Sequence, residues 1–136
     1  MKTLNKQIKT WIFDLDNTLY SADSGIFQQV HDLMGKFVSS HLKIDIEEAK
    51  KIQKNYFHEY NTTLNGMIKN HKIDANEFLE FVHDVDYSIV EPNHKLNLEL
   101  KKLEGRKIIY TNANMQHALD VLERIELSNF FDEIYD

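Results

Sequence analysis

The chain has 136 residues, enough to bury one hydrophobic core but too few for two full-sized domains. Hydrophobic residues make up 42% and charged residues 28%, a composition that excludes a disordered chain, and the absence of Cys excludes disulfides and thiolate metal sites. The formal net charge of −6 argues against a nucleic-acid polymer as partner, because phosphate backbones bind clustered Lys and Arg.

The first nine residues, 1–9, are basic and are not followed by an apolar stretch long enough for a signal peptide or a membrane span. Together with the lack of Cys, this pattern predicts a cytoplasmic protein without a membrane partner. A small anionic ligand is compatible with the negative net charge, because such a ligand needs only local positive groups. The sequence predicts no particular oligomeric state.

A first strand is predicted at Trp11–Phe13, where an apolar run without helical spacing is typical of a parallel strand buried on both faces. It ends at Asp14 and Asp16, which leave on the same side because side chains alternate along a strand. Two carboxylates this close repel unless a cation lies between them or one keeps its proton. The pair predicts either a site for an ion such as Mg²⁺ or an acid beside an ionised nucleophile; the alternative is a solvated acidic turn.

Four helical segments are predicted between residues 25 and 84, a region without a strand pattern. The first has apolar residues at helical spacing from Ile26 to Leu42. The second begins at Asp45 with a capping-box pattern. Two shorter segments are predicted over 64–68 and from Asp74 onward. This run of helices predicts a helical lobe inserted into an α/β core.

The chain returns to the core near Pro92, which precedes a fifth helix with Asn93 as its cap. Gly105 is expected to end this helix in a left-handed conformation, and a second buried strand follows over 106–112. A third strand begins near Phe130. We therefore assign the core to residues 1–20 and 91–136, and the inserted helical cap domain to residues 21–90.

The second strand ends in polar residues, as the first does. If the two strands are parallel neighbours, Thr111 and Asn112 lie beside Asp14 at the same sheet edge. Hydroxyl and backbone donors at such an edge can hold phosphate oxygens. The helix that follows would direct its positive amino-terminal end toward the same space.

The segment Asp14–Tyr20 resembles the first motif of the haloacid dehalogenase (HAD) superfamily. The resemblance implies that Asp14 forms an aspartyl-phosphate and that Asp16 protonates the leaving oxygen and then activates water. It also implies Mg²⁺ as cofactor, held by the Asp14 carboxylate and the Asp16 backbone carbonyl. The second Asp favours a phosphatase or phosphotransferase over a dehalogenase. The fold implied is α/β, a partial three-layer Rossmann-like HAD core of parallel strands with an inserted helical cap domain.

Thr111–Ala113 resembles the second HAD motif, which implies that the Thr111 hydroxyl and the Asn112 amide bind phosphate. A strand-to-helix turn with Thr as a helix cap is the alternative. Further similarity, in 60–66, in 71–74 and around His117, resembles the pyrimidine 5'-nucleotidase-like branch. That branch implies Tyr60 and His117 as possible substrate contacts.

Members of this superfamily continue with a third-motif Lys and a fourth-motif acidic pair, and the residues after Asp132 supply neither. The chain therefore resembles the amino-terminal portion of a longer protein. Three functions are compatible with the sequence. They are a Mg²⁺-dependent phosphomonoesterase for a small phosphate ester such as a pyrimidine nucleoside 5'-monophosphate, a truncated and impaired fragment or phosphate- and metal-binding module, and a phosphotransferase or phosphomutase.

Overall fold

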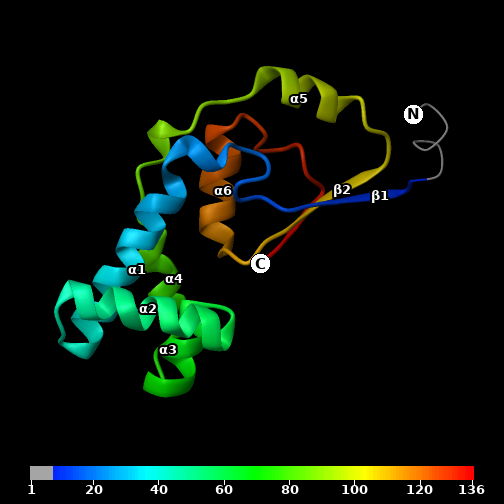
Figure 1. Cartoon of the computed structure of the whole chain (residues 1–136). Coiled ribbons are helices and arrows are strands. Elements are labelled where there is room, and N and C mark those ends of the chain that lie inside the picture. Colours follow the sequence, from blue (N-terminus) through cyan, green and yellow to red (C-terminus); the bar gives the residue numbers. More distant parts are fainter. Residues whose placement is uncertain (1–7) are drawn as a thin grey trace. The chain divides into compact units, whose positions relative to one another are not determined.

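A computed structural model describes residues 8–136 of the chain, which divides into two compact units (Figure 1). The first unit contains residues up to Ile26 and from Tyr87 to Asp136, and the second contains Phe27–Asp86. The division expected from the sequence had its boundaries after residues 20 and 90.

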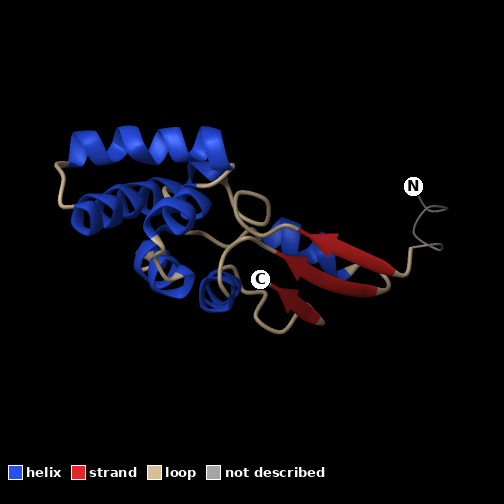
Figure 2. Cartoon of the chain, turned by 90° about the horizontal axis from the view of Figure 1, so that it is seen from below, coloured by secondary structure: helices blue, strands red, loops and turns tan. Residues whose placement is uncertain are grey.

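The first unit contains a three-stranded parallel sheet (Figure 2). Its strands, in the order in which they lie, are β1 (Thr10–Phe13), β2 (Arg106–Tyr110) and β3 (Glu133–Tyr135). Phe13 is in register with Ile109, so β1 and β2 end at the same edge. The predicted α/β architecture with parallel strands is thus confirmed.

The two faces of this sheet differ in burial. Ile109 on one face is fully buried, whereas Ile12 and Tyr110 on the other are 68% and 65% exposed. Figure 2 shows helix behind the strands and none drawn in front of them. The prediction that the first strand is buried on both faces is therefore wrong. An apolar run reports a strand's capacity for burial, but the elements that pack on each face decide whether it is buried.

The remaining elements of the first unit are helical: η1 (Ala22–Ser24), η2 (Tyr87–Ile89), α5 (His94–Lys101) and α6 (Met115–Arg124). Asn93 caps α5 as predicted, because its side chain accepts a hydrogen bond from the backbone N–H of Leu96 at 3.0 Å. The core of this unit is formed chiefly by side chains from the turn after β1, from α6 and from the segment that follows α6. Its most buried apolar side chains are Leu15, Ile26, Val90, Ile109, Ala118, Val121, Leu122, Ile125 and Leu127.

Gly105 does not end α5, which corrects the expectation from the sequence. The cap residue of that helix is Lys102, which keeps a right-handed conformation. Gly105 instead has φ +105° just before β2, and a Cβ there would lie 2.9 Å from the carbonyl oxygen of Lys9. The backbone N–H of Arg106 donates to that same oxygen at 2.9 Å. Glycine is required here because β1 and β2 approach closely as they begin to pair.

The second unit consists of helices: α1 (Ile26–Leu42), α2 (Ile46–Tyr60), α3 (Thr63–His71) and α4 (Ala75–Val82). Asp45 and Asp74 cap α2 and α4, as their sequence patterns predict, each accepting a backbone N–H at 2.9 Å. The helix α3 is longer than the segment predicted over 64–68. The core of this unit is made of large apolar side chains, chiefly Phe37, Val38, Met67, Phe78 and Val82.

Candidate active site

The turn that follows β1 places two carboxylates on either side of a fully buried Leu15. The Leu15 carbonyl accepts the backbone N–H groups of Thr18 and Leu19 at 3.2 and 3.0 Å, which closes the chain into a tight turn. Asp14 is exposed, and its Oδ2 accepts a hydrogen bond from the Thr18 hydroxyl at 3.1 Å. The buried Leu15 therefore anchors the turn while Asp14 faces outward.

Asp16 has different surroundings from Asp14. Its side chain is only 31% exposed, and its Oδ1 accepts a hydrogen bond from the Tyr20 hydroxyl at 2.6 Å. Burial, reinforced by the charge of Asp16 and by this bond, raises the pKa of Tyr20 far above its ordinary value. Tyr20 therefore keeps its proton, and remains a donor to Asp16, even at a pH where an ordinary tyrosine ionises.

The second partner of Asp16 is His117 on α6. The Nε2 atom of His117 lies 2.7 Å from Oδ1 of Asp16, and the His117 side chain is 1% exposed. The Nδ1 atom of His117 lies 2.7 Å from the hydroxyl of Tyr87 on η2. Four side chains, Tyr87, His117, Asp16 and Tyr20, thus form one hydrogen-bonded series inside the first unit.

Thr111 and Asn112 follow β2 at the edge where β1 also ends, as the sequence predicts. Thr111 is 5% exposed, and its hydroxyl accepts the backbone N–H of Ala113 at 3.1 Å. This contact belongs to the turn between β2 and α6, but Thr111 is not the cap residue of that helix, as the alternative from the sequence had it. Asn112 is exposed. Convergence of the Thr111 hydroxyl with Asp14 and Asp16 on one anion stays a prediction.

The amino-terminal turn of α6 already has acceptors within the protein. Asn114 is the cap residue and accepts the backbone N–H of His117 at 2.9 Å. The carboxylate of Asp136 accepts the backbone N–H of Met115 at 2.8 Å. These carboxylate and amide oxygens accept N–H groups at the amino-terminal end of α6, toward which the sequence predicts that an anionic ligand would lie.

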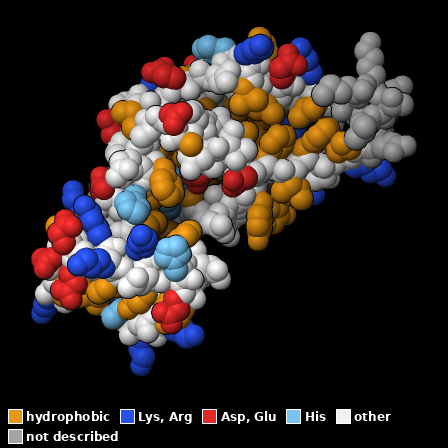
Figure 3. All heavy atoms as spheres, viewed as in Figure 1, with side chains coloured by type: hydrophobic (Ala, Val, Ile, Leu, Met, Phe, Trp, Pro, Cys, Tyr) orange, Lys and Arg blue, Asp and Glu red, His pale blue; other side chains and the backbone are white. Residues whose placement is uncertain are grey.

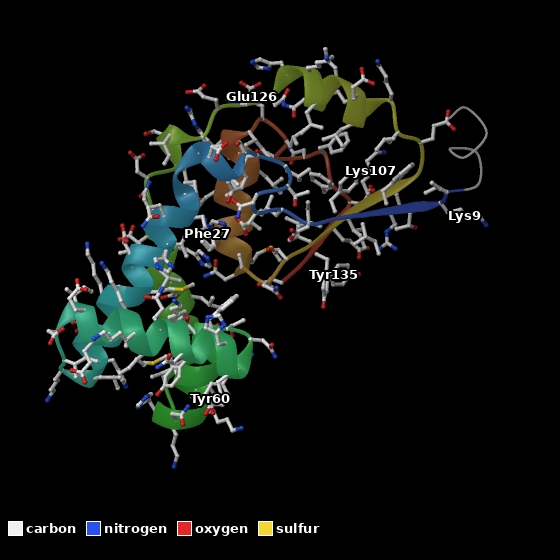
Figure 4. The ribbon with its side chains drawn as sticks, in the orientation of Figure 1. Lys9, Phe27, Tyr60, Lys107, Glu126 and Tyr135 are labelled. Carbon is white, nitrogen blue, oxygen red and sulfur yellow. The ribbon has the colours of Figure 1, made fainter. Side chains whose placement is uncertain are left out.

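Tyr60, the other predicted substrate contact, is the last residue of α2 in the second unit (Figure 4). The Nζ atom of Lys69 lies 5.2 Å from the centre of the Tyr60 ring, and the centre of the Tyr56 ring lies 5.7 Å from the same point. An amide hydrogen bond of 3.3 Å joins the Asn65 side chain to the Tyr60 carbonyl. Asn65 therefore has a structural contact at the end of α2.

Within residues 8–136, no group of three or more His, Cys, Asp or Glu side chains could together hold a metal ion. The turn after β1 supplies two carboxylates, those of Asp14 and Asp16, together with backbone carbonyls. Such oxygen ligands suit Mg²⁺, an ion that keeps several waters and often needs only one or two protein carboxylates. The residues present are therefore compatible with Mg²⁺ as a partly hydrated ion.

Sequence reasoning gave no role to two tyrosines of this site. Tyr20 had a usable signal, because it stands four residues after Asp16 within one turn of chain. Tyr87 had none: it lies 30 positions before His117 and reaches it only through the fold. The site as a whole joins residues from the turn after β1, from η2 and from α6.

The fold and the site together define a mixed α/β protein with a paired-carboxylate site at the carboxyl edge of a parallel sheet. No protein-family model matches the chain. The chain is similar to Phosphate metabolism protein 8 of Saccharomyces cerevisiae, with 28% identity over 138 aligned residues. The match covers 93% of this chain but only 42% of the yeast protein. Among the residues described, no helix is long and apolar enough to span a membrane.

Proposed function

We propose that the protein containing this chain is a Mg²⁺-dependent phosphomonoesterase of the HAD type. Its substrate would be a small phosphate ester, such as a pyrimidine nucleoside 5'-monophosphate. The observation that carries the proposal is the unequal environment of two carboxylates one residue apart: Asp14 faces outward, whereas Asp16 is hydrogen-bonded to Tyr20 and His117. Unequal environments are how one site obtains a nucleophile and a proton carrier from the same residue type. The name of the yeast relative, which refers to phosphate metabolism, supports this choice.

The proposed reaction has two steps. A carboxylate oxygen of Asp14 attacks phosphorus, the bond between phosphorus and the ester oxygen breaks, and Asp16 gives its proton to the departing alkoxide. Water then attacks the phosphoryl group on Asp14 while Asp16 takes a proton from that water. The bond between phosphorus and the Asp14 oxygen breaks, and inorganic phosphate leaves with both carboxyl groups restored to their starting states. Thr111 and the backbone amide of Asn112 would bind the phosphate oxygens.

The proposed Mg²⁺ would be held by the Asp14 carboxylate and the Asp16 backbone carbonyl. When bound, it would supply positive charge that offsets the charge of the phosphoryl group. The Thr18 hydroxyl already donates to Oδ2 of Asp14, which restricts how that carboxylate can turn toward an ion or a phosphate. Removal of Mg²⁺ with a chelator should abolish phosphate release, and added Mg²⁺ should restore it.

Phosphate release from a panel of nucleoside 5'-monophosphates tests the proposal, with the complete gene product compared with its Asp14→Asn variant. We expect the substitution to lower kcat by about a thousandfold or more, because an amide cannot replace the attacking carboxylate. Asp23→Asn is the matched control, since Asp23 is an exposed carboxylate of the same unit that lies in η1. Equal turnover by the unaltered protein and by Asp14→Asn would contradict the proposal.

A module that binds phosphate and metal without turnover is the second candidate. It is favoured because no group of three or more His, Cys, Asp or Glu side chains within residues 8–136 could together complete a metal site. The chain spans less than half of the yeast protein that it matches. The complete gene product is therefore the form in which the metal site of the first candidate has to be tested, and the isolated chain is the form that tests the second. Hydrolysis of p-nitrophenyl phosphate by the isolated 136-residue chain at ordinary enzyme rates would exclude this second candidate.

A further inference from the structure

Two hydrogen bonds of the Asp16 side chain share one oxygen atom. Oδ1 receives the Tyr20 hydroxyl at 2.6 Å and lies 2.7 Å from Nε2 of His117. An ionised carboxylate can only accept, so in that state both neighbours direct their hydrogens at Oδ1. The two partners come from different parts of the fold, Tyr20 from the turn after β1 and His117 from α6. Because two donors from separate elements bond to the same oxygen, they fix the orientation of the Asp16 carboxylate.

The imidazole that makes one of these contacts is itself fixed. Its side chain is 1% exposed, and Nδ1 lies 2.7 Å from the Tyr87 hydroxyl. Its backbone N–H donates to the Asn114 side chain, which caps the start of α6. His117 is therefore held at its backbone and at both ring nitrogens.

We propose that His117 is a positioning residue: together with Tyr20 it fixes the Asp16 carboxylate through Oδ1, and Tyr87 fixes the ring of His117. The inference rests on the proposed function, in which Asp16 carries the proton to the leaving oxygen. It replaces the expectation that His117 contacts substrate, because both ring nitrogens already have protein partners. Proton transfer requires the carrier to be aligned with the departing oxygen, and small errors of position lower such rates steeply.

The test compares two substrates that differ in their need for an acid. The leaving group of a nucleoside 5'-monophosphate is a strongly basic alkoxide, which needs the proton. The leaving group of p-nitrophenyl phosphate is a weakly basic phenolate, which does not. The measured quantity is kcat/KM of the complete gene product, which reports the steps up to cleavage of the ester bond. We expect His117→Leu to lower kcat/KM about a hundredfold for the nucleotide and by less than about threefold for the aryl ester.

Two further variants keep the test decisive if His117→Leu folds poorly. In His117→Gln the side-chain amide retains an N–H donor toward Asp16, and we expect at least about a tenfold recovery for the nucleotide relative to His117→Leu. In Tyr87→Phe the ring keeps its shape but loses the bond to Nδ1, and the same unequal loss should appear in weaker form. His94→Gln is the matched control, since His94 contacts Glu126 at 3.4 Å in the same unit but is 75% exposed.

The possible outcomes separate this inference from the proposed function. Equal losses for the two substrates, or no loss in His117→Leu, would overturn the positioning role and leave the phosphatase proposal intact. Absence of phosphate release by the unaltered protein would remove the proposed function and this inference with it. A selective loss for the nucleotide, with recovery by His117→Gln, supports the inference.

Discussion

Asp14 and Asp16 show how neighbouring residues of one type acquire different chemistry. Asp14 is exposed and hydrogen-bonded to Thr18, while Asp16 is turned toward Tyr20 and a buried His117. The alternation of side chains along β1 and a fully buried Leu15 between the two acids produce the difference. The local sequence predicts the pair, but the partners that distinguish its members come in part from elsewhere in the chain.

Tyr20 gives this site a measurable pH dependence. Its pKa is raised in the folded protein, first by burial and then by Asp16, so the folded state holds the proton more tightly than the unfolded chain. The resulting stability is complete below the ordinary tyrosine pKa of about 10 and is lost as the pH rises above it. Above that pH, the free energy of unfolding should therefore fall more steeply with pH in the unaltered chain than in Tyr20→Phe. The two slopes should differ by up to about 1.4 kcal/mol per pH unit.

Urea unfolding of the isolated chain between pH 8 and about pH 11 measures this difference in slope. At neutral pH we expect Tyr20→Phe to be less stable by about 1–2 kcal/mol, because a hydrogen bond to a charged group is lost. Tyr110→Phe, on a side chain that is 65% exposed, is the control and should keep the steep slope of the unaltered chain. Parallel pH curves for the unaltered chain and Tyr20→Phe would contradict the assignment.

Helices α2 and α3 pack closely because of Gly66. A Cβ at this position would lie 2.4 Å from Cβ and Cγ of Tyr56, so any larger residue forces the two helices apart. We expect Gly66→Ala to lower the free energy of unfolding by about 1–3 kcal/mol despite the better helix propensity of alanine. Urea unfolding of the isolated chain measures the loss.

Gly35→Ala is the matched control for this substitution. Gly35 also lies inside a helix, α1, but its added Cβ would meet only side-chain atoms, the closest being Oε1 of Gln53 at 3.3 Å. We expect a change of less than about 1 kcal/mol, because the gain in helix propensity offsets the tight contact. If both variants lost the same free energy, close approach at Gly66 would not be the cause.

Local signals predict the helices well and the sheet less well. Asp45, Asp74 and Asn93 are caps in the structure because a cap depends on only three or four consecutive residues. The exposure of Ile12 could not be predicted in the same way, since it depends on what packs against a strand. The contact between Tyr87 in η2 and His117 could not be predicted either, because the two residues are 30 positions apart and no local pattern indicates that they meet.

One face of the sheet leaves apolar side chains exposed to solvent. Figure 3 shows hydrophobic side chains at the surface along the strands, and in Figure 4 the Tyr135 side chain projects away from the ribbon. Ile12, Tyr110 and Tyr135 on this face are 68%, 65% and 47% exposed. Contiguous apolar surface of this kind promotes association.

We therefore expect the isolated chain to associate as its concentration rises, and the double variant Ile12→Thr, Tyr110→Thr to associate less. Threonine suits a strand and removes most of the apolar surface at each position. Sedimentation velocity over a series of concentrations measures the effect. Leu98→Thr is the control, because Leu98 is 61% exposed but lies on α5. Equal association of the chain and the double variant would show that the sheet face is not responsible.

The identity of the residue that receives the phosphoryl group can be determined directly. The complete gene product is mixed with p-nitrophenyl phosphate and Mg²⁺, quenched in acid, and its peptides are analysed by mass spectrometry. We predict one added phosphoryl group on Asp14, more of it in Asp16→Asn because water is then activated poorly, and none in Asp14→Asn. A phosphoryl group on another residue, or turnover without any phosphorylated peptide in Asp16→Asn, would contradict the assignment of the two carboxylates.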